Sequence, residues 1–117
     1  MAAPNIIGAT TINGKTAVLA ITTSATAIVS NSAASGKVLK CNTLLVANID
    51  GTNNASVDVD IYRSSTAYQI AYQMTVPAGA TLDMLSQPLY LEEGDSLRLT
   101  ANVDSDLMGT VSYEDIS

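Results

Sequence analysis

Short segments in which apolar and polar residues alternate cover most of this chain, and turn residues end each segment. Residues 95–103 place apolar side chains at every second position, namely Leu97, Leu99, Ala101 and Val103. Residues 56–63 follow the same pattern, with Val57, Val59 and Ile61 on one side. A period of two residues is typical of β-strands with one buried face, and no segment keeps the 3.6-residue period of a long helix. The pattern therefore predicts an antiparallel sheet protein.

Turns rich in Gly, Pro, Asn and Asp divide the chain into about eight or nine such segments. We expect strands over residues 16–23, 25–30, 37–50, 56–63, 68–76, 82–84, 89–91, 97–103 and 109–114. The alternation within residues 68–76 predicts an inward face made of Tyr68, Ile70, Tyr72, Met74 and Val76. The expected fold class is all-β: a single antiparallel β-sandwich of about eight strands, jelly-roll-like or immunoglobulin-like, with an extended N-terminal arm.

Residues 37–50 differ from the other segments because apolar side chains occupy both faces of the expected strand. One face carries Leu39, Cys41, Leu45, Ala47 and Ile49, and the other carries Val38, Leu44 and Val46. A strand that is apolar on both faces is usually covered on both sides. In a single sandwich the second cover comes from a loop, from the N-terminal arm or from another subunit, so the segment indicates oligomerisation.

The start of the chain is expected to be an arm. We assign residues 1–15 to this arm and a first hairpin turn, and residues 16–117 to the β-sandwich domain. Asn13-Gly14 indicates the turn, because both central positions of a type I′ turn need positive φ. The Ala, Thr and Ile residues of the arm suit addition of a strand to an exposed sheet edge. The residues predicted to contact other subunits are Pro4, Ile6, Ile7, Ile12, Leu44 and Val46.

Composition and charge narrow the possible partners. The chain has 117 residues, of which 47% are hydrophobic and 14% are charged, and it contains no Trp or Phe. So few charges predict a neutral polar surface that neighbouring subunits partly cover. The net charge of -6 opposes binding to nucleic acid and to anionic membranes. No apolar run approaches the ~20 residues of a membrane helix, and the N-terminus does not resemble a signal peptide.

The residue types that carry most enzymatic chemistry are scarce. The chain has no His, so the usual Ser or Cys triad cannot be assembled. Its single cysteine, Cys41, lies in an apolar run and is expected to be a buried small hydrophobic residue. Gly8 and the Gly14-Lys15-Thr16 segment imitate a phosphate-binding loop, but the spacing is one residue too long and a strand follows instead of a helix. We therefore predict a protein that is not an enzyme and has no cofactor.

Carboxylates and tyrosines are the remaining candidates for a binding site. Weak candidates for calcium ligands are Asp50, Asp58, Asp60, Asp104 and Asp106. They lack EF-hand spacing, so solvated turn and outer-face positions are the expected alternative. Paired carboxylates also occur in glycosidases. The tyrosines could form a carbohydrate platform, although core or interface positions are the expected alternative for most of them: Tyr62, Tyr68, Tyr72, Tyr90 and Tyr113.

Several segments resemble small virion structural proteins of tailed bacteriophages, especially of cyanobacterial myoviruses. They are Ala3–Asn5 with Thr10–Ile12 and Gly14–Ala17, then Leu45–Thr52, Val76–Leu82 and Leu89–Leu97. The resemblance covers nearly the whole chain as a pattern and contains no catalytic signature. It implies a β-sandwich subunit that is built into a virus particle.

The resemblance is compatible with two functions, and the carboxylates suggest a third. The first is capsid decoration, in which the protein is a cement subunit on the outer surface of the head. It would form a symmetric homo-oligomer, with a trimer expected, and would bind the major capsid protein or another virion protein after synthesis in the host cytoplasm. The alternative is a tail, collar or receptor-binding accessory subunit with a carbohydrate or calcium site. A third and weaker hypothesis is a small hydrolase that uses Asp58 and Asp60.

Overall fold

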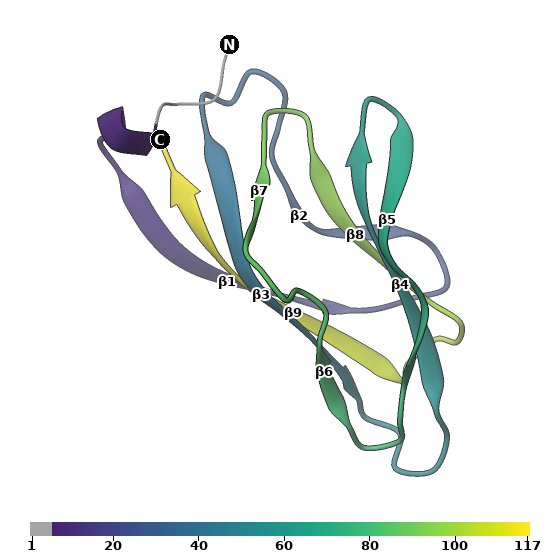
Figure 1. Cartoon of the computed structure of the whole chain (residues 1–117). Coiled ribbons are helices and arrows are strands. Elements are labelled where there is room, and N and C mark those ends of the chain that lie inside the picture. Colours follow the sequence, from purple (N-terminus) through teal and green to yellow (C-terminus); the bar gives the residue numbers. More distant parts are fainter. Residues whose placement is uncertain (1–5) are drawn as a thin grey trace.

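The computed structural model describes residues 6–117, and nearly all of its regular structure is β-strand (Figure 1). The chain described begins with a short 3-10 helix, η1 (Ile6–Gly8). The strands that follow are β1 (Ile12–Ala20), β2 (Thr26–Ser30), β3 (Val38–Asn48), β4 (Ala55–Arg63), β5 (Thr66–Val76), β6 (Thr81–Asp83), β7 (Leu89–Leu91), β8 (Ser96–Ala101) and β9 (Leu107–Ile116). Within residues 6–117, no helix has the length and apolar character needed to cross a membrane.

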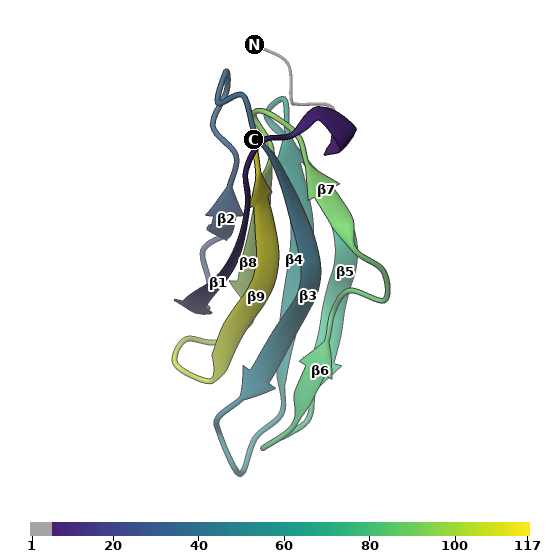
Figure 2. The same ribbon diagram turned by 90° about the vertical axis from the view of Figure 1, so that its left-hand side faces the viewer.

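The strands form two antiparallel sheets that lie face to face (Figure 2). Sheet A has the order β1-β9-β3-β6, and β7 also pairs with β3, whereas sheet B has the order β2-β8-β4-β5. The pairs are nested in the sequence, because β1 pairs with β9, β2 with β8, β3 with β6 and β7, and β4 with β5. Successive pairs alternate between the two sheets, as in a jelly roll. The expected all-β sandwich is therefore confirmed.

Apolar side chains from both sheets fill the space between the layers. Alternation predicted the inward residues of β4 and β8 correctly, since the side chains of Val57, Val59, Leu97 and Leu99 are fully buried. Gly109 of β9 faces the same core. A Cβ atom at this position would stand 2.7 Å from Cδ1 of Leu99, so the close approach of the sheets requires glycine here.

Strand β3 contains a bulge that changes which of its side chains point inward. Its register against β9 shifts between Cys41 and Thr43. Cys41 is buried as expected, and burial raises the pKa of its thiol to about 11. Beyond the bulge the phase of alternation is reversed, so Leu44 and Val46 are buried while Leu45 is exposed. The strand is therefore not apolar on both faces. Leu44 and Val46 lie in the core, which corrects their assignment to a subunit contact.

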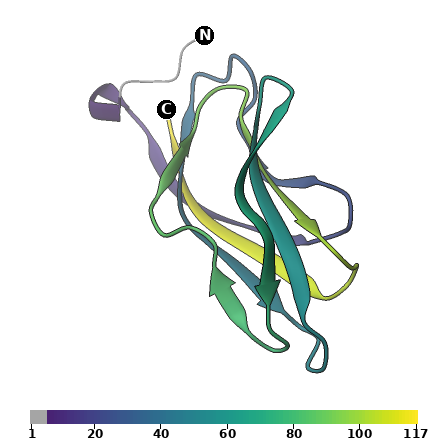
Figure 3. The same cartoon turned by 45° about the vertical axis from the view of Figure 1, so that its right-hand side comes forward.

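Strand β5, at the edge of sheet B, exposes most of the side chains that were expected to point inward. Among them only Val76 is buried, whereas the others are 40% to 67% exposed: Tyr68, Ile70, Tyr72 and Met74. The register of β5 against β4 shifts twice, so the alternation is interrupted. On the side of sheet A, the neighbouring cover consists of β6 and β7, which have 3 residues each (Figure 3). The prediction of a continuous inward face on β5 is therefore wrong.

The predicted hairpin turn at Asn13-Gly14 is absent, because both residues lie inside β1. They pair with Asp115 and Glu114 of β9. A full-length partner strand thus outweighs the local preference of Asn-Gly for a turn. Residues 12–15, which we placed in the arm, belong to the edge of sheet A. Just before β1, the backbone N–H groups of residues 10 and 11 each donate to the carbonyl oxygen of Ser117 at 2.9 Å.

Candidate functional site

Two of the three loop residues that were weak candidates for metal ligands, Asp50 and Asp104, use their carboxylates to hold loops; Asp106 contributes a backbone carbonyl that accepts a bond from the N–H of Ile49. The Asp50 carboxylate accepts hydrogen bonds from the backbone N–H groups of Thr52 and Asn53 and from the Asn53 side chain. These hydrogen bonds lower the pKa of Asp50, and the bond from the Thr52 backbone has the largest effect. Asp104 accepts a bond from the backbone of Thr23 in another loop. Across residues 6–117, no three His, Cys, Asp or Glu side chains gather into a group that could hold a metal ion.

The two carboxylates of β4 are also engaged within the protein. Asp58 accepts a 2.6 Å hydrogen bond from the backbone N–H of Gln73. The Asp60 side chain is buried and receives two bonds from Arg98, with the guanidinium Nε at 2.9 Å. The guanidinium carbon of Arg98 in turn lies 4.0 Å from the centre of the Tyr62 ring. Asp60 is therefore held in an ion pair on the outside of sheet B and does not face a substrate cleft with Asp58.

The outer side of sheet A carries an uncharged surface that spans three strands. Leu19, Gly109 and Val46 lie side by side and face the core, so the positions next to them in each strand point outward. These outward positions form three rows across β1, β9 and β3: Thr16–Ser112–Thr43, Val18–Thr110–Leu45 and Ala20–Met108–Ala47. We call these nine residues the sheet A face. None is charged and none is buried.

The sheet A face is accessible and partly apolar. Val18 at its β1 edge is 75% exposed, and Leu45 and Met108 are exposed to about half that extent. Charged residues begin only at its margins, where Lys40 pairs with Glu114 in register and Asp83 stands beside Leu45. A neutral, exposed and partly apolar surface of this kind suits contact with another protein.

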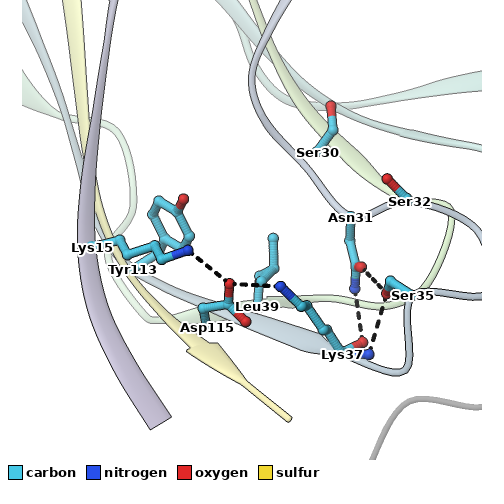
Figure 4. A pocket seen from close by; sticks show the side chains of 9 residues that line it. All are labelled: Lys15, Ser30, Asn31, Ser32, Ser35, Lys37, Leu39, Tyr113 and Asp115. Carbon is cyan, nitrogen blue, oxygen red and sulfur yellow. Dashed lines mark hydrogen bonds and ion pairs between the residues drawn. The ribbon is translucent and has the colours of Figure 1, made fainter. Parts of the chain in front are cut away.

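A second candidate site is a polar pocket at one end of the sandwich (Figure 4). Its volume is about 260 Å³, and it lies between β1, β9, the start of β3 and the loop that connects β2 to β3. The lining residues are Lys15, Ser30, Asn31, Ser32, Ser35, Lys37, Leu39, Tyr113 and Asp115. The strand pairing β1–β9–β3 brings together residues from both ends of the sequence.

One buried carboxylate organises the positive charge in this pocket. Lys15 and Lys37 both donate to the same oxygen, Oδ2 of Asp115, at 3.1 and 3.2 Å. Burial by itself would raise the pKa of Asp115, but the hydrogen bonds from the two ammonium groups outweigh this effect and lower it. The bond to Asp115 also raises the pKa of Lys15. Asp115 and Lys15 are therefore both charged at neutral pH.

A buried asparagine fixes the loop on the other side of the pocket. The Asn31 amide nitrogen donates to the carbonyl oxygens of Lys37 and Leu91, and its amide oxygen accepts a bond from the Ser35 hydroxyl. The Asn31 carbonyl also accepts a bond from the N–H of Gly94. The loop is thus tied to the remainder of the fold, so the pocket wall that it forms has a defined position.

The six predicted contact residues do not form one surface. Pro4 lies outside the described residues, while Ile6, Ile7 and Ile12 are exposed near the start of β1. The sequence analysis missed both the sheet A face and the pocket. A signal for the first was present, because the positions between the inward residues of β1 and β9 carry no charge over residues 16–20 and 108–112. The pocket had no sequence signal, because its two lysines are brought together by strand pairing.

Comparisons with known proteins give little support for a specific family. No protein-family model matches the chain, and no curated protein matches it. Among solved structures, it is similar to a pentameric capsid protein from metagenomic phage sequences, with a TM-score of 0.40 and 15% sequence identity. The match covers 85% of this chain and 59% of that protein, so the chain spans less than two thirds of its length.

Proposed function

We propose that this protein is a non-enzymatic structural subunit of a bacteriophage particle that decorates the outer surface of the head. The sequence resemblance to small phage virion proteins motivates the proposal, and the jelly-roll sandwich is a fold that suits it. A cement role in particular is inferred from the sheet A face. The cement role requires contact with other copies of the chain and with the shell beneath them.

The observation that carries the proposal is the absence of charge from the sheet A face. Each copy has a net charge of -6, so copies repel one another wherever their carboxylates approach. The sheet A face has no carboxylate, and it presents Val18, Leu45 and Met108 to the solvent. We therefore assign this face to the contact between copies in a symmetric homo-oligomer, and we expect a trimer.

The energy available from such a contact is sufficient for a cement role. Stable protein interfaces bury about 800 Å² on each partner. Apolar area contributes roughly 25 cal/mol per Å² when it is removed from water, before the costs of association are subtracted. Because a head carries many copies, even a modest contribution from each one would strengthen the shell. The contact with the major capsid protein is assigned to the segment before β1 together with the first residue of β1, where Ile6, Ile7 and Ile12 are exposed.

A charge-insertion experiment tests the assigned contact. The double variant Val18→Lys with Leu45→Lys places two positive charges per copy on the sheet A face, so copies that meet there repel. We expect sedimentation velocity to show an oligomer for the wild-type protein and a monomer for the variant. The control is Thr100→Lys on the outside of sheet B, where the new lysine would stand beside Asp58. Unchanged assembly of the double variant would refute the contact.

Density mapping of assembled phage particles tests the location. Decoration predicts repeated density on the outside of the head, with the chain fitting as a sandwich. Particles made without the protein are then expected to release their DNA at a lower temperature than complete particles. Density on the tail or collar would exclude decoration. A wild-type protein that stays monomeric at every concentration would exclude the oligomer without excluding a place in the particle.

A further inference from the structure

We propose that the pocket between Lys15 and Lys37 binds an acidic sugar, with the carboxylate of the sugar held by the two ammonium groups and its hydroxyl groups held by the polar wall opposite. This inference goes beyond the proposed structural role and does not depend on where in a particle the protein lies. It rests on charge, on hydroxyl groups that have no hydrogen-bond partner within residues 6–117, and on the size of the pocket.

Two basic side chains, Lys15 and Lys37, line the pocket. Of the 5 Lys and Arg residues in the chain, only Lys15 and Lys37 share a site. Arg63 is engaged by Asp95 and Glu92, and Arg98 is engaged by Asp60. One carboxylate against two ammonium groups leaves the pocket with a local charge of about +1, whereas the whole chain carries -6. A small anion is therefore attracted to this pocket.

The two ammonium groups keep hydrogen-bond capacity for a ligand. An ammonium has three N–H donors. The ammonium groups of Lys15 and Lys37 each donate one hydrogen bond, to Asp115. Their side chains remain 47% and 43% exposed, respectively. Figure 4 shows both ammonium groups pointing toward the Asp115 carboxylate from opposite sides. The buried carboxylate lies between the two ammonium groups and holds them in place, so an anion binds on their exposed sides. Binding there costs little side-chain entropy, because the lysines are already restricted.

The remaining walls of the pocket suit a hydroxylated ligand. The hydroxyl groups of Ser32 and Tyr113 have no hydrogen-bond partner within residues 6–117. Within the described residues, the Ser30 hydroxyl bonds to the hydroxyl of Ser96, and it can also accept a bond from a ligand. Figure 4 shows Ser30 and Ser32 across the pocket from Lys15 and Tyr113. The Tyr113 ring adds a flat apolar wall of the kind on which sugar rings pack.

The size and overall charge exclude larger anions. A volume of about 260 Å³ lies below the range of roughly 300–1,000 Å³ that is typical of sites for drug-sized ligands. A nucleic acid or another polyanion would also be repelled by the acidic surface outside the pocket. The pocket therefore suits one small ring with one negative group, such as a uronic acid.

The test is an NMR titration of ¹⁵N-labelled protein with sodium glucuronate, with glucose and sodium sulfate as parallel ligands. We expect glucuronate to shift the backbone resonances of Ser32, Lys37 and Tyr113 with a dissociation constant in the millimolar range. We expect glucose to bind at least tenfold more weakly, because it lacks the charge. Sulfate should compete at the same residues. The proposal is refuted if glucuronate moves no resonance of the pocket, or if sulfate binds and glucuronate does not.

Variants separate ligand binding from a purely structural role of the lysines. Lys37→Met should weaken glucuronate binding at least tenfold, while the matched control Lys40→Met, which lies outside the pocket, should leave it unchanged. Because Lys37→Met also breaks an ion pair, Ser32→Ala serves as a second variant that removes one hydroxyl and no charge. It should weaken binding by about threefold with an unchanged melting temperature. Equal affinities for wild type, Lys37→Met and Ser32→Ala would overturn the proposal.

Discussion

On the outside of sheet B, Arg98 bonds to the buried carboxylate of Asp60 and stacks on Tyr62, so these two charged groups satisfy each other. On the outside of sheet A, the nine residues of the sheet A face are all Thr, Ser, Ala, Val, Leu or Met. Both sheets bury a similar apolar face inward. The difference shows that alternation alone identifies the inner face, whereas the residue types at the outward positions indicate which outer face is available to another protein.

The largest effect expected from this comparison follows from breaking the ion pair on sheet B. Asp60→Ala leaves the guanidinium of Arg98 without its carboxylate partner, and we expect a loss of about 3 kcal/mol in the free energy of unfolding. Thr16→Ala, on the sheet A face, should change it by less than about 0.5 kcal/mol. Urea unfolding followed by circular dichroism measures both values.

A double variant distinguishes the unpaired charge from a general defect of sheet B. Asp60→Ala combined with Arg98→Met removes both charges, so much of the lost stability should return. If the double variant is as unstable as Asp60→Ala alone, the cost arises from lost packing, and the contrast between the two faces is weaker than we propose.

A smaller effect is expected where the two sheets approach each other most closely. Gly109→Ala places a methyl group 2.7 Å from Cδ1 of Leu99, which must move within a packed core. We expect a loss of about 2 kcal/mol, typical of overpacking. The control Gly51→Ala lies in a loop where an added Cβ meets no atom within 4 Å. Equal stability of the Gly109 variant and the wild type would show that the layers can separate at no cost.

The smallest effect concerns pH and the pocket at the end of sheet A. The pKa of Asp115 is lowered in the folded protein, so its ion pairs stabilise the fold above the ordinary carboxyl pKa of about 3.9. This contribution is lost as the pH falls through the lowered value. Asp115→Asn should therefore melt at a lower temperature than wild type at pH 7, and the two should converge toward pH 2. A constant difference at all pH values would contradict this role.

Sequence reasoning succeeded where a strand is regular and failed where the pairing partner sets the geometry. Val57, Val59, Leu97, Leu99 and Ala101 were identified correctly as inward residues of regular strands, whereas Val103, also assigned inward, is exposed beyond the end of β8. In β3 one extra residue between Cys41 and Thr43 reverses the phase, and nothing in the local sequence distinguishes this bulge from a continuous strand. The apolar residues of β5 were assigned inward because alternation reveals neither an edge position nor the shortness of the strands that cover it.

The candidate sites show the same limit. Leu44 and Val46 were assigned to a subunit contact as a direct result of the missed bulge, since both are buried in the core. Lys15 and Lys37 stand 22 positions apart in the sequence, and Asp115 lies near the other end of the chain. They meet because β9 inserts between β1 and β3. No local pattern encodes that insertion, so the pocket could not be predicted from the sequence.

The insertion of β9 between β1 and β3 also has a consequence for synthesis on the ribosome. Strands β1 and β3 do not pair with each other in the fold because β9 lies between them, and β9 is translated after both. Until residues 107–116 leave the exit tunnel, β1 and β3 each have an open backbone edge. Nascent chains with such edges are prone to pair with one another. Premature termination before Leu107 should therefore yield aggregated chains, and few shortened folded domains.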